Sequence, residues 1–246
     1  MAKFKVVTGI VLRHIEYGEA EKLFIVLSPT GKVKAFAKGV RKVSSKNAGH
    51  LELFSHAHIQ LVEGNSNRYI IGSALAIDKF DILANHIEKF AIAMFACEYI
   101  DVVATENDDN AYHRLLLMLK NLRDQEYNVN VILFVMAHLS IIAGIQPSIE
   151  ACAECGETTT PEDVFYSVEH GGVICQYCHT TTSAQTLNLH TIKILRNMYR
   201  NMSKPIEQKL SIESVHFVAQ LLYKQITYML DNPLKTWKMV EDVVLK

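Results

Sequence analysis

The sequence lacks the short motifs that identify the commonest nucleotide-binding and hydrolytic enzymes. It contains no G-x-x-x-x-G-K-[ST] phosphate loop, no G-x-G-x-x-G after a predicted strand, no G-x-S-x-G nucleophile elbow and no H-E-x-x-H zinc motif. Its adjacent acidic residues, such as Asp108 and Asp109, lie in polar loops, where sequence neighbours seldom converge on one reacting atom. We therefore expect a protein that is not an enzyme.

Long apolar runs and export signals are also missing. The most apolar segment, residues 131–145, is interrupted by His138 and Ser140. It is shorter than the roughly 20 residues that a membrane-spanning helix needs. The first residues, Met-Ala-Lys-Phe-Lys-Val-Val, form neither an extended apolar region nor a cleavage site. These absences lead us to expect a soluble cytoplasmic protein with no membrane partner.

Basic residues are absent from one long stretch and concentrated in another. Residues 152–190 carry five acidic side chains and no Lys or Arg, whereas residues 1–80 carry twelve basic and six acidic side chains, a net charge of +6. Residues 81–151 have a net charge of −6 and residues 191–246 one of +4. An acidic segment is poorly suited to binding phosphate, so any nucleic-acid site is expected in the N-terminal part.

Cysteine is scarce, but its spacing is informative. Four of the five cysteines form two C-x-x-C pairs, Cys152 with Cys155 and Cys175 with Cys178. Two such pairs, about twenty residues apart, are typical of a four-cysteine zinc site. The segment between them has few apolar residues, and a structural zinc ion contributes about 10–16 kcal/mol to folding in zinc-finger peptides. We expect one structural Zn²⁺ in a small module at residues 148–184.

The cysteine pattern allows three other interpretations. Disulfides require an oxidising compartment, which the missing export signal disfavours. The C-x-x-C-H pattern at Cys175–His179 also matches a haem attachment site, but the upstream pair argues against it. His170 or His179 could replace one thiolate, although four thiolates are already present. Cys97 lies in an apolar helical pattern and is expected in the core.

Hydrophobic periodicity divides the chain into a β-rich and a helical part. Five short strands are predicted at residues 4–15, 22–27, 33–38, 54–62 and 69–76, with a long connection between the third and fourth. This arrangement favours an OB-fold-like barrel over residues 1–80. Helices are predicted from 86 onward, interrupted by the zinc module. The expected fold is α+β and multidomain: a barrel at 1–80, then a helical domain at 81–246 with the module inserted at 148–184.

The third predicted strand carries the candidate nucleic-acid site. Alternation along a strand places Lys34, Phe36 and Lys38 on one face, and cations continue into the following loop with no acid between them. Such a face suits single-stranded nucleic acid, because cations contact phosphates while an aromatic ring stacks on a base. The candidate binding residues are Lys32, Lys34, Phe36, Lys38, Arg41, Lys42 and Lys46.

These features resemble the RecO family of bacterial recombination mediators. The resemblance covers nearly the whole chain and is most specific in the following motifs: Gly9-Ile-Val-Leu-Arg13, Tyr17-Gly-Glu19, Gly31-Lys-Val-Lys-Ala35, Lys38-Gly-Val-Arg-Lys42, Ser45 and Leu53-Phe54. The four cysteines match the zinc-bearing branch. The resemblance implies a cytoplasmic, nucleoid-associated protein that binds and anneals single-stranded DNA. It also implies partners: RecR, single-stranded DNA-binding protein and, indirectly, RecA, which the mediator helps to load onto coated strands.

A second class of function stays open at this point. A zinc-stabilised adaptor could use the same basic strand to bind an acidic protein instead of DNA. The two classes differ in an observable way, because binding to DNA weakens steeply and independently of sequence as salt rises.

Overall fold

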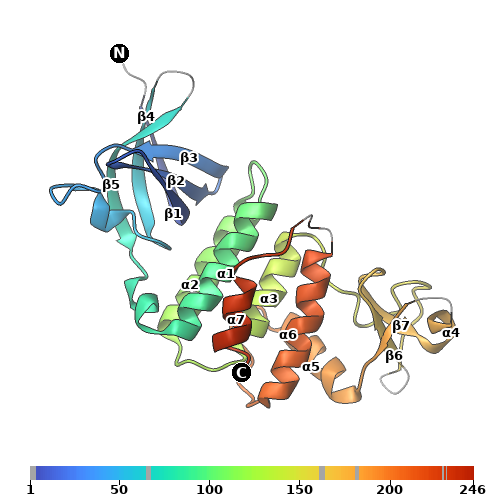
Figure 1. Ribbon diagram of the computed structural model, residues 1–246. Helices are drawn as coiled ribbons and strands as arrows, with labels where there is room; N and C mark the ends of the chain where they lie inside the picture. Colours follow the sequence, from blue (N-terminus) through green and yellow to red (C-terminus); the bar gives the residue numbers. More distant parts are fainter. Residues whose placement is uncertain (1–3, 65–67, 161–163, 181–182, 229, 231) are drawn as a thin grey trace. The chain divides into compact units, whose positions relative to one another are not determined.

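The N-terminal strands close into a barrel (Figure 1). The computed structural model describes the chain except for residues 1–3, 65–67, 161–163, 181–182, 229 and 231. The strands are β1 (Phe4–Tyr17), β2 (Glu21–Ser28), β3 (Gly31–Ala37), β4 (His56–Glu63) and β5 (Tyr69–Asp78), in the order β1-β2-β3-β5-β4. The β3–β5 pairing is parallel and the other pairings are antiparallel. The closed five-stranded order is that of an OB-fold, as predicted.

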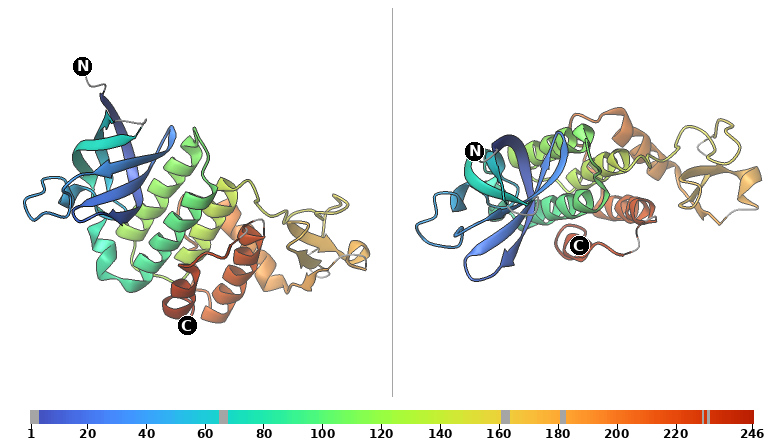
Figure 2. Two further views of the ribbon diagram at one scale, coloured as in Figure 1. Left: turned by 45° about the horizontal axis from the view of Figure 1, so that its top comes forward. Right: turned by 90° about the horizontal axis from the view of Figure 1, so that it is seen from above.

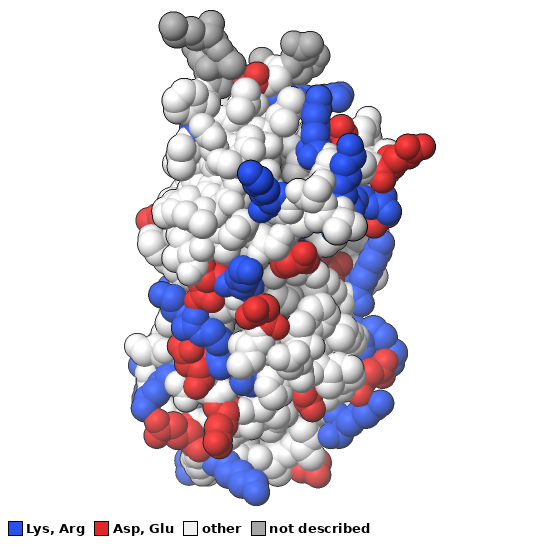
Figure 3. Space-filling view, turned by 90° about the vertical axis from the view of Figure 1, so that its left-hand side faces the viewer, with Lys and Arg blue, Asp and Glu red and all other residues white. Residues whose placement is uncertain are grey.

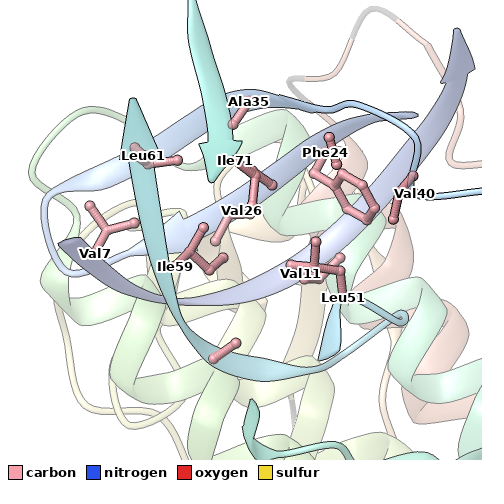
Figure 4. Close-up of a cluster of buried hydrophobic side chains, with 12 residues drawn as sticks. Val7, Val11, Phe24, Val26, Ala35, Val40, Leu51, Ile59, Leu61 and Ile71 are labelled. Atoms are coloured by element: carbon pink, nitrogen blue, oxygen red, sulfur yellow. The ribbon is translucent and has the colours of Figure 1, made fainter. Parts of the chain in front are cut away.

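The barrel core is formed by the side chains that point inward from alternate strand positions (Figure 4). Phe24 and Val26 from β2 pack with Ile59 and Leu61 from β4, and Val40 from the loop after β3 joins them. Fully burying a side chain of this size contributes about 1.5–3 kcal/mol. Because Val40 is part of this core, the start of the long β3–β4 connection is fixed to the barrel.

Strand β3 has the register that the sequence predicts. Ala35 and Ala37 are buried, Lys34 and Lys38 are exposed, and Phe36 is half-buried. The segment between β3 and β4, which includes a short 3₁₀ helix at Ala48–His50, projects from the barrel in both views of Figure 2. The basic strand face and this loop therefore belong to one surface.

Two helices complete the first compact unit, Met1–Gln125. A 3₁₀ turn at Asp81–Asn85 leads into α1 (Ile87–Val103), and α2 (Asp109–Asp124) begins after the N-cap Asp108, whose carboxylate accepts from the Ala111 amide. Ion pairs join these helices to the barrel: Arg13 Nε lies 2.5 Å from Asp101 Oδ2, and Arg123 pairs with Asp78.

The second compact unit, Glu126–Lys246, contains the remaining helices. They are α3 (Val131–Ile142), α5 (Leu189–Arg200), α6 (Ile212–Thr227) and α7 (Trp237–Val243). Helix α3 is apolar around most of its circumference and packs against α5 and α6. Its N-cap Asn130 donates from Nδ2 to the carbonyls of Ile206 and Gln208, at 2.9 and 2.8 Å.

The cysteine-containing segment forms a small module within the second unit. It consists of β6 (Val164–Ser167), β7 (Gly172–Cys175), α4 (Gln176–His179) and β8 (Gln185–Thr186), with sheet order β7-β6-β8. Strands β6 and β7 pair antiparallel as a hairpin, and β7 ends at Cys175. The domain boundaries at residue 80 and at 148–184 remain predictions about which segments fold on their own. No described helix is both long and apolar enough to cross a membrane.

Candidate nucleic-acid interface and metal centre

Two turns bring the four cysteines to one point. The first C-x-x-C pair occupies a turn in which the Cys152 amide donates to the Glu157 carbonyl at 2.8 Å and the Gly156 amide donates to the Cys152 carbonyl at 2.9 Å. Gly156 has a φ of +79°, a conformation that favours glycine. Cys175 ends β7, and Cys178 lies in the short helix α4. All four sulfur atoms lie within 4.8 Å of one another.

The sulfur geometry fits a four-coordinate zinc ion. Zn–S bonds of about 2.3 Å in a tetrahedron place the sulfurs about 3.8 Å apart, and the Sγ atoms of Cys155 and Cys175 are separated by 3.9 Å. A disulfide would require about 2.05 Å. Four thiolate ligands would leave no coordination position for water, so a zinc ion held by these cysteines would join the two turns and take no part in a reaction.

One of the four cysteines has a lowered pKa, which favours the thiolate form that binds a metal ion. Burial raises the pKa of Cys152, but amide donors of Cys155, Cys175 and Glu154 outweigh this and lower its pKa to about 6. Side-chain hydrogen bonding to Cys175 raises the pKa of Cys178 to about 12. A metal ion bound by the four sulfurs would displace the protons that the thiols still carry.

The two histidines considered as alternative ligands lie outside this cluster. His170 Nε2 lies 3.0 Å from Glu154 Oε2, and its Nδ1 lies 3.1 Å from Ser167 Oγ. His179 stacks on Phe165 with ring centroids 3.6 Å apart. Both rings instead contact other side chains of the segment that carries the cysteines.

The basic loop after β3 is held at both ends. The Arg41 amide donates to the Ala20 carbonyl at 3.3 Å, next to the buried Val40. Farther on, Asn47 Oδ1 accepts from the Ala74 amide at 3.1 Å. The cations between these anchors are thus presented by a fixed segment. We define the basic face as Lys34, Lys38, Arg41, Lys42 and Lys46, all of which are exposed.

The surface around the basic face carries mostly positive charge, with some acidic side chains among the cations. In Figure 3, Lys and Arg side chains gather on one side of the upper part of the view, with a few acidic side chains between them. Arg41 lies 3.5 Å from Glu16 across exposed surface. Lys32 is placed differently, because its Nζ donates to the Asp101 carbonyl at 2.5 Å and lies 3.8 Å from Oδ1 of that residue. We leave Lys32 out of the basic face because helix α1 already holds its ammonium group.

The structure adds two residues that the sequence did not point to. Tyr17 meets Phe36 edge to face with ring centroids 5.2 Å apart, and the Arg68 guanidinium lies 5.9 Å from the Phe36 centroid. Both neighbours come from other strand ends. Barrel closure, and not the local pattern, brings them to β3.

Comparison with known proteins agrees with this architecture. The family model described as "Recombination protein O N terminal" matches residues 1–79, and the one described as "Recombination protein O C terminal" matches residues 84–238. A protein named DNA repair protein RecO from Dehalococcoides mccartyi strain BAV1 is 31% identical over 196 residues, covering 78% of this chain and 77% of its own length. The protein of that name from Roseiflexus sp. strain RS-1 is 30% identical over 203 residues, covering 81% and 70%. The chain therefore belongs to the RecO family and has a role in DNA repair and recombination.

Proposed function

We propose that this protein is a recombination mediator that binds and anneals single-stranded DNA without catalysing a reaction of its own. With RecR, it helps to load RecA onto strands coated by single-stranded DNA-binding protein. Membership of the family supports this role, and the partners follow from the resemblance described above.

One observation carries the DNA-binding part of the proposal. An OB-fold barrel presents five exposed cations on β3 and the anchored loop that follows it. The face of strands 2 and 3 is the surface with which this fold binds oligonucleotides elsewhere. Cations so arranged can follow a phosphate backbone, and neutralising phosphates reduces the repulsion between two strands that are to pair.

Zinc enters the proposal as a structural ion. Cys152, Cys155, Cys175 and Cys178 would hold one Zn²⁺ within the second unit, where the surrounding segment is acidic. An acidic module is unsuited to DNA, so we propose that it serves folding and protein contacts.

The test is fluorescence anisotropy of the full chain with a labelled single-stranded oligonucleotide at several salt concentrations. If the basic face neutralises about four phosphates, log affinity falls against log salt with a slope near −3, from about −0.7 per contact. A shallow slope, or binding to an acidic protein but to no oligonucleotide, would favour the adaptor instead.

A further inference from the structure

A hollow of about 240 Å³ lies on the outer surface of the barrel beside the basic face. It is bounded by residues of β1, β2, β3 and β5 and by residues next to these strands. The lining includes Tyr17, Glu21, Phe36, Lys38, Arg68 and Ile70. The hollow is smaller than the roughly 300–1,000 Å³ of pockets for drug-sized ligands, so it suits one flat ring system.

The aromatic side chains of the hollow are arranged for stacking. Phe36 is half-buried and pairs in register with Ile70 of β5, outside the core cluster. Tyr17 is 53% exposed and presents its ring beside Phe36. Among the described residues, no carboxylate lies within ion-pair distance of Arg68, whose guanidinium faces the Phe36 ring. Aromatic faces and a guanidinium plane are the groups on which unpaired bases stack.

Glu21 supplies a hydrogen-bond acceptor in the hollow. Its side chain lines the hollow together with Lys38 and Arg68 and forms no ion pair with a described residue. The amino group on the Watson–Crick edge of a base would be attracted to this carboxylate as a hydrogen-bond donor. A carboxylate accepts a hydrogen bond from cytosine N4, but thymine offers carbonyl oxygens on both sides of its single N–H.

We propose that this hollow binds one nucleobase of the bound strand and prefers cytosine to thymine through Glu21. The inference rests on the proposed function, since the base arrives on a strand held by the basic face. Phe36 provides the stacking surface, Tyr17 borders it edge to face, and the Glu21 carboxylate accepts a hydrogen bond from the base edge. The protein would then bind single strands of every sequence, but not equally well.

The test is the affinity of the full chain for oligo(dC) and oligo(dT) of equal length, measured by anisotropy at pH 8 and fixed salt. We expect oligo(dC) to bind roughly three- to tenfold more tightly, as the net gain from one additional hydrogen bond provides. Glu21→Gln should abolish this difference, because an amide can donate to thymine as well as accept from cytosine. Glu19→Gln, an exposed change of the same charge in the same hairpin, should leave the difference intact.

Stacking is tested separately by Tyr17→Ala and Phe36→Ala. Phe36→Ala should weaken binding to both oligonucleotides about fivefold or more while the salt slope is preserved, since a stacked ring releases no counterions. Tyr17→Ala, which removes a ring that stands edge-on to Phe36, should weaken binding less, also with the salt slope preserved. Equal affinity for the two oligonucleotides, or a difference that survives Glu21→Gln, would overturn the base pocket and leave DNA binding by the basic face standing. Absence of binding to either oligonucleotide would overturn both proposals.

Discussion

At the scale of single residues, Arg41 is set apart from its neighbours on the basic face by its ion pair with Glu16. The Arg41 side chain is 37% exposed and that of Glu16 is 65% exposed, with 3.5 Å between Nη1 and Oε2. An exposed pair of this kind is worth about 0–1 kcal/mol. On the proposed function, a DNA phosphate that binds Arg41 would have to displace a weak competitor, so Glu16 would lower the affinity of the surface for DNA.

Replacing Glu16 with Gln should strengthen DNA binding. The substitution frees Arg41 and removes one negative charge near the phosphates, so affinity for a mixed-sequence oligonucleotide should rise about two- to fourfold at low salt. Glu88→Gln removes the same charge from the first turn of α1, where Glu88 is half-buried, and should change affinity much less. Equal gains from both variants would assign the effect to net charge alone.

His56 makes the stability of the first unit depend on pH. Its Nε2 lies 2.8 Å from the Tyr112 hydroxyl, and burial, then the charge of Lys120, lowers its pKa. As pH falls through about 6.5, the unfolded chain takes up this proton before the folded chain does, so folding stability present above that pH is lost below it. Urea unfolding at pH 7.5 and 5.5 should show a smaller loss for His56→Gln than for the wild type. An equal loss would remove His56 from this account.

Whether a feature of a single residue could be predicted from the sequence depended on how far along the chain its contact partner lies. Alternation alone predicted the faces of Lys34, Phe36 and Lys38, because successive strand residues point to opposite sides. The contact between Lys32 and Asp101 joins residues 69 positions apart, and no local pattern reveals it. The neighbours of Phe36 also come from the far ends of other strands.

At the scale of elements, the zinc module should depend on its metal. Cys155→Ala removes one of four ligands, so we expect loss of bound zinc by elemental analysis and a Tm lower by roughly 5–10 °C. DNA affinity should change less than twofold. Tyr177→Ala, at an 88% exposed residue between Cys175 and Cys178 in the same module, is the control and should keep both zinc and Tm. Wild-type protein that contains no zinc would remove the ion from this account.

The barrel and its first two helices should fold as one element. Arg13 and Lys32 bind Asp101 of α1, and Arg123 of α2 pairs with Asp78. We therefore expect a fragment of residues 1–125 to unfold cooperatively and a fragment of residues 1–80 to be markedly less stable in urea, since it leaves these partners and the apolar surface beneath α1 uncovered. Equal stability of the two fragments would support independent folding of the predicted 1–80 domain.

The sequence predicted the elements well. Period-two alternation and turn residues placed all five barrel strands, and two C-x-x-C pairs placed the cysteine cluster, because these signals are local. The change from strand to helix near residue 80 predicts a domain boundary there, which stays a prediction about what folds alone, and the contacts group Met1–Gln125 into one compact unit. Which helices pack on a barrel depends on long-range contacts that periodicity does not contain.

At the scale of the whole molecule, charge separates the proposed tasks. The net charge of −1 conceals +6 in residues 1–80, −6 in residues 81–151, −5 in residues 152–190 and +4 in residues 191–246. Two segments could therefore attract DNA on charge alone. The central claim is that the basic face of the barrel, and not the C-terminal basic segment, binds the single strand.

The most direct test compares two double charge reversals of the full chain by anisotropy with a single-stranded oligonucleotide. Lys38→Glu with Arg41→Glu alters the basic face, and Lys193→Glu with Lys209→Glu makes the same change in net charge at exposed residues of the second unit. We predict that the first variant loses at least tenfold in affinity with a flatter salt slope and an unchanged Tm, while the second loses less than threefold. The opposite ranking would contradict the account and move the DNA site to the C-terminal segment.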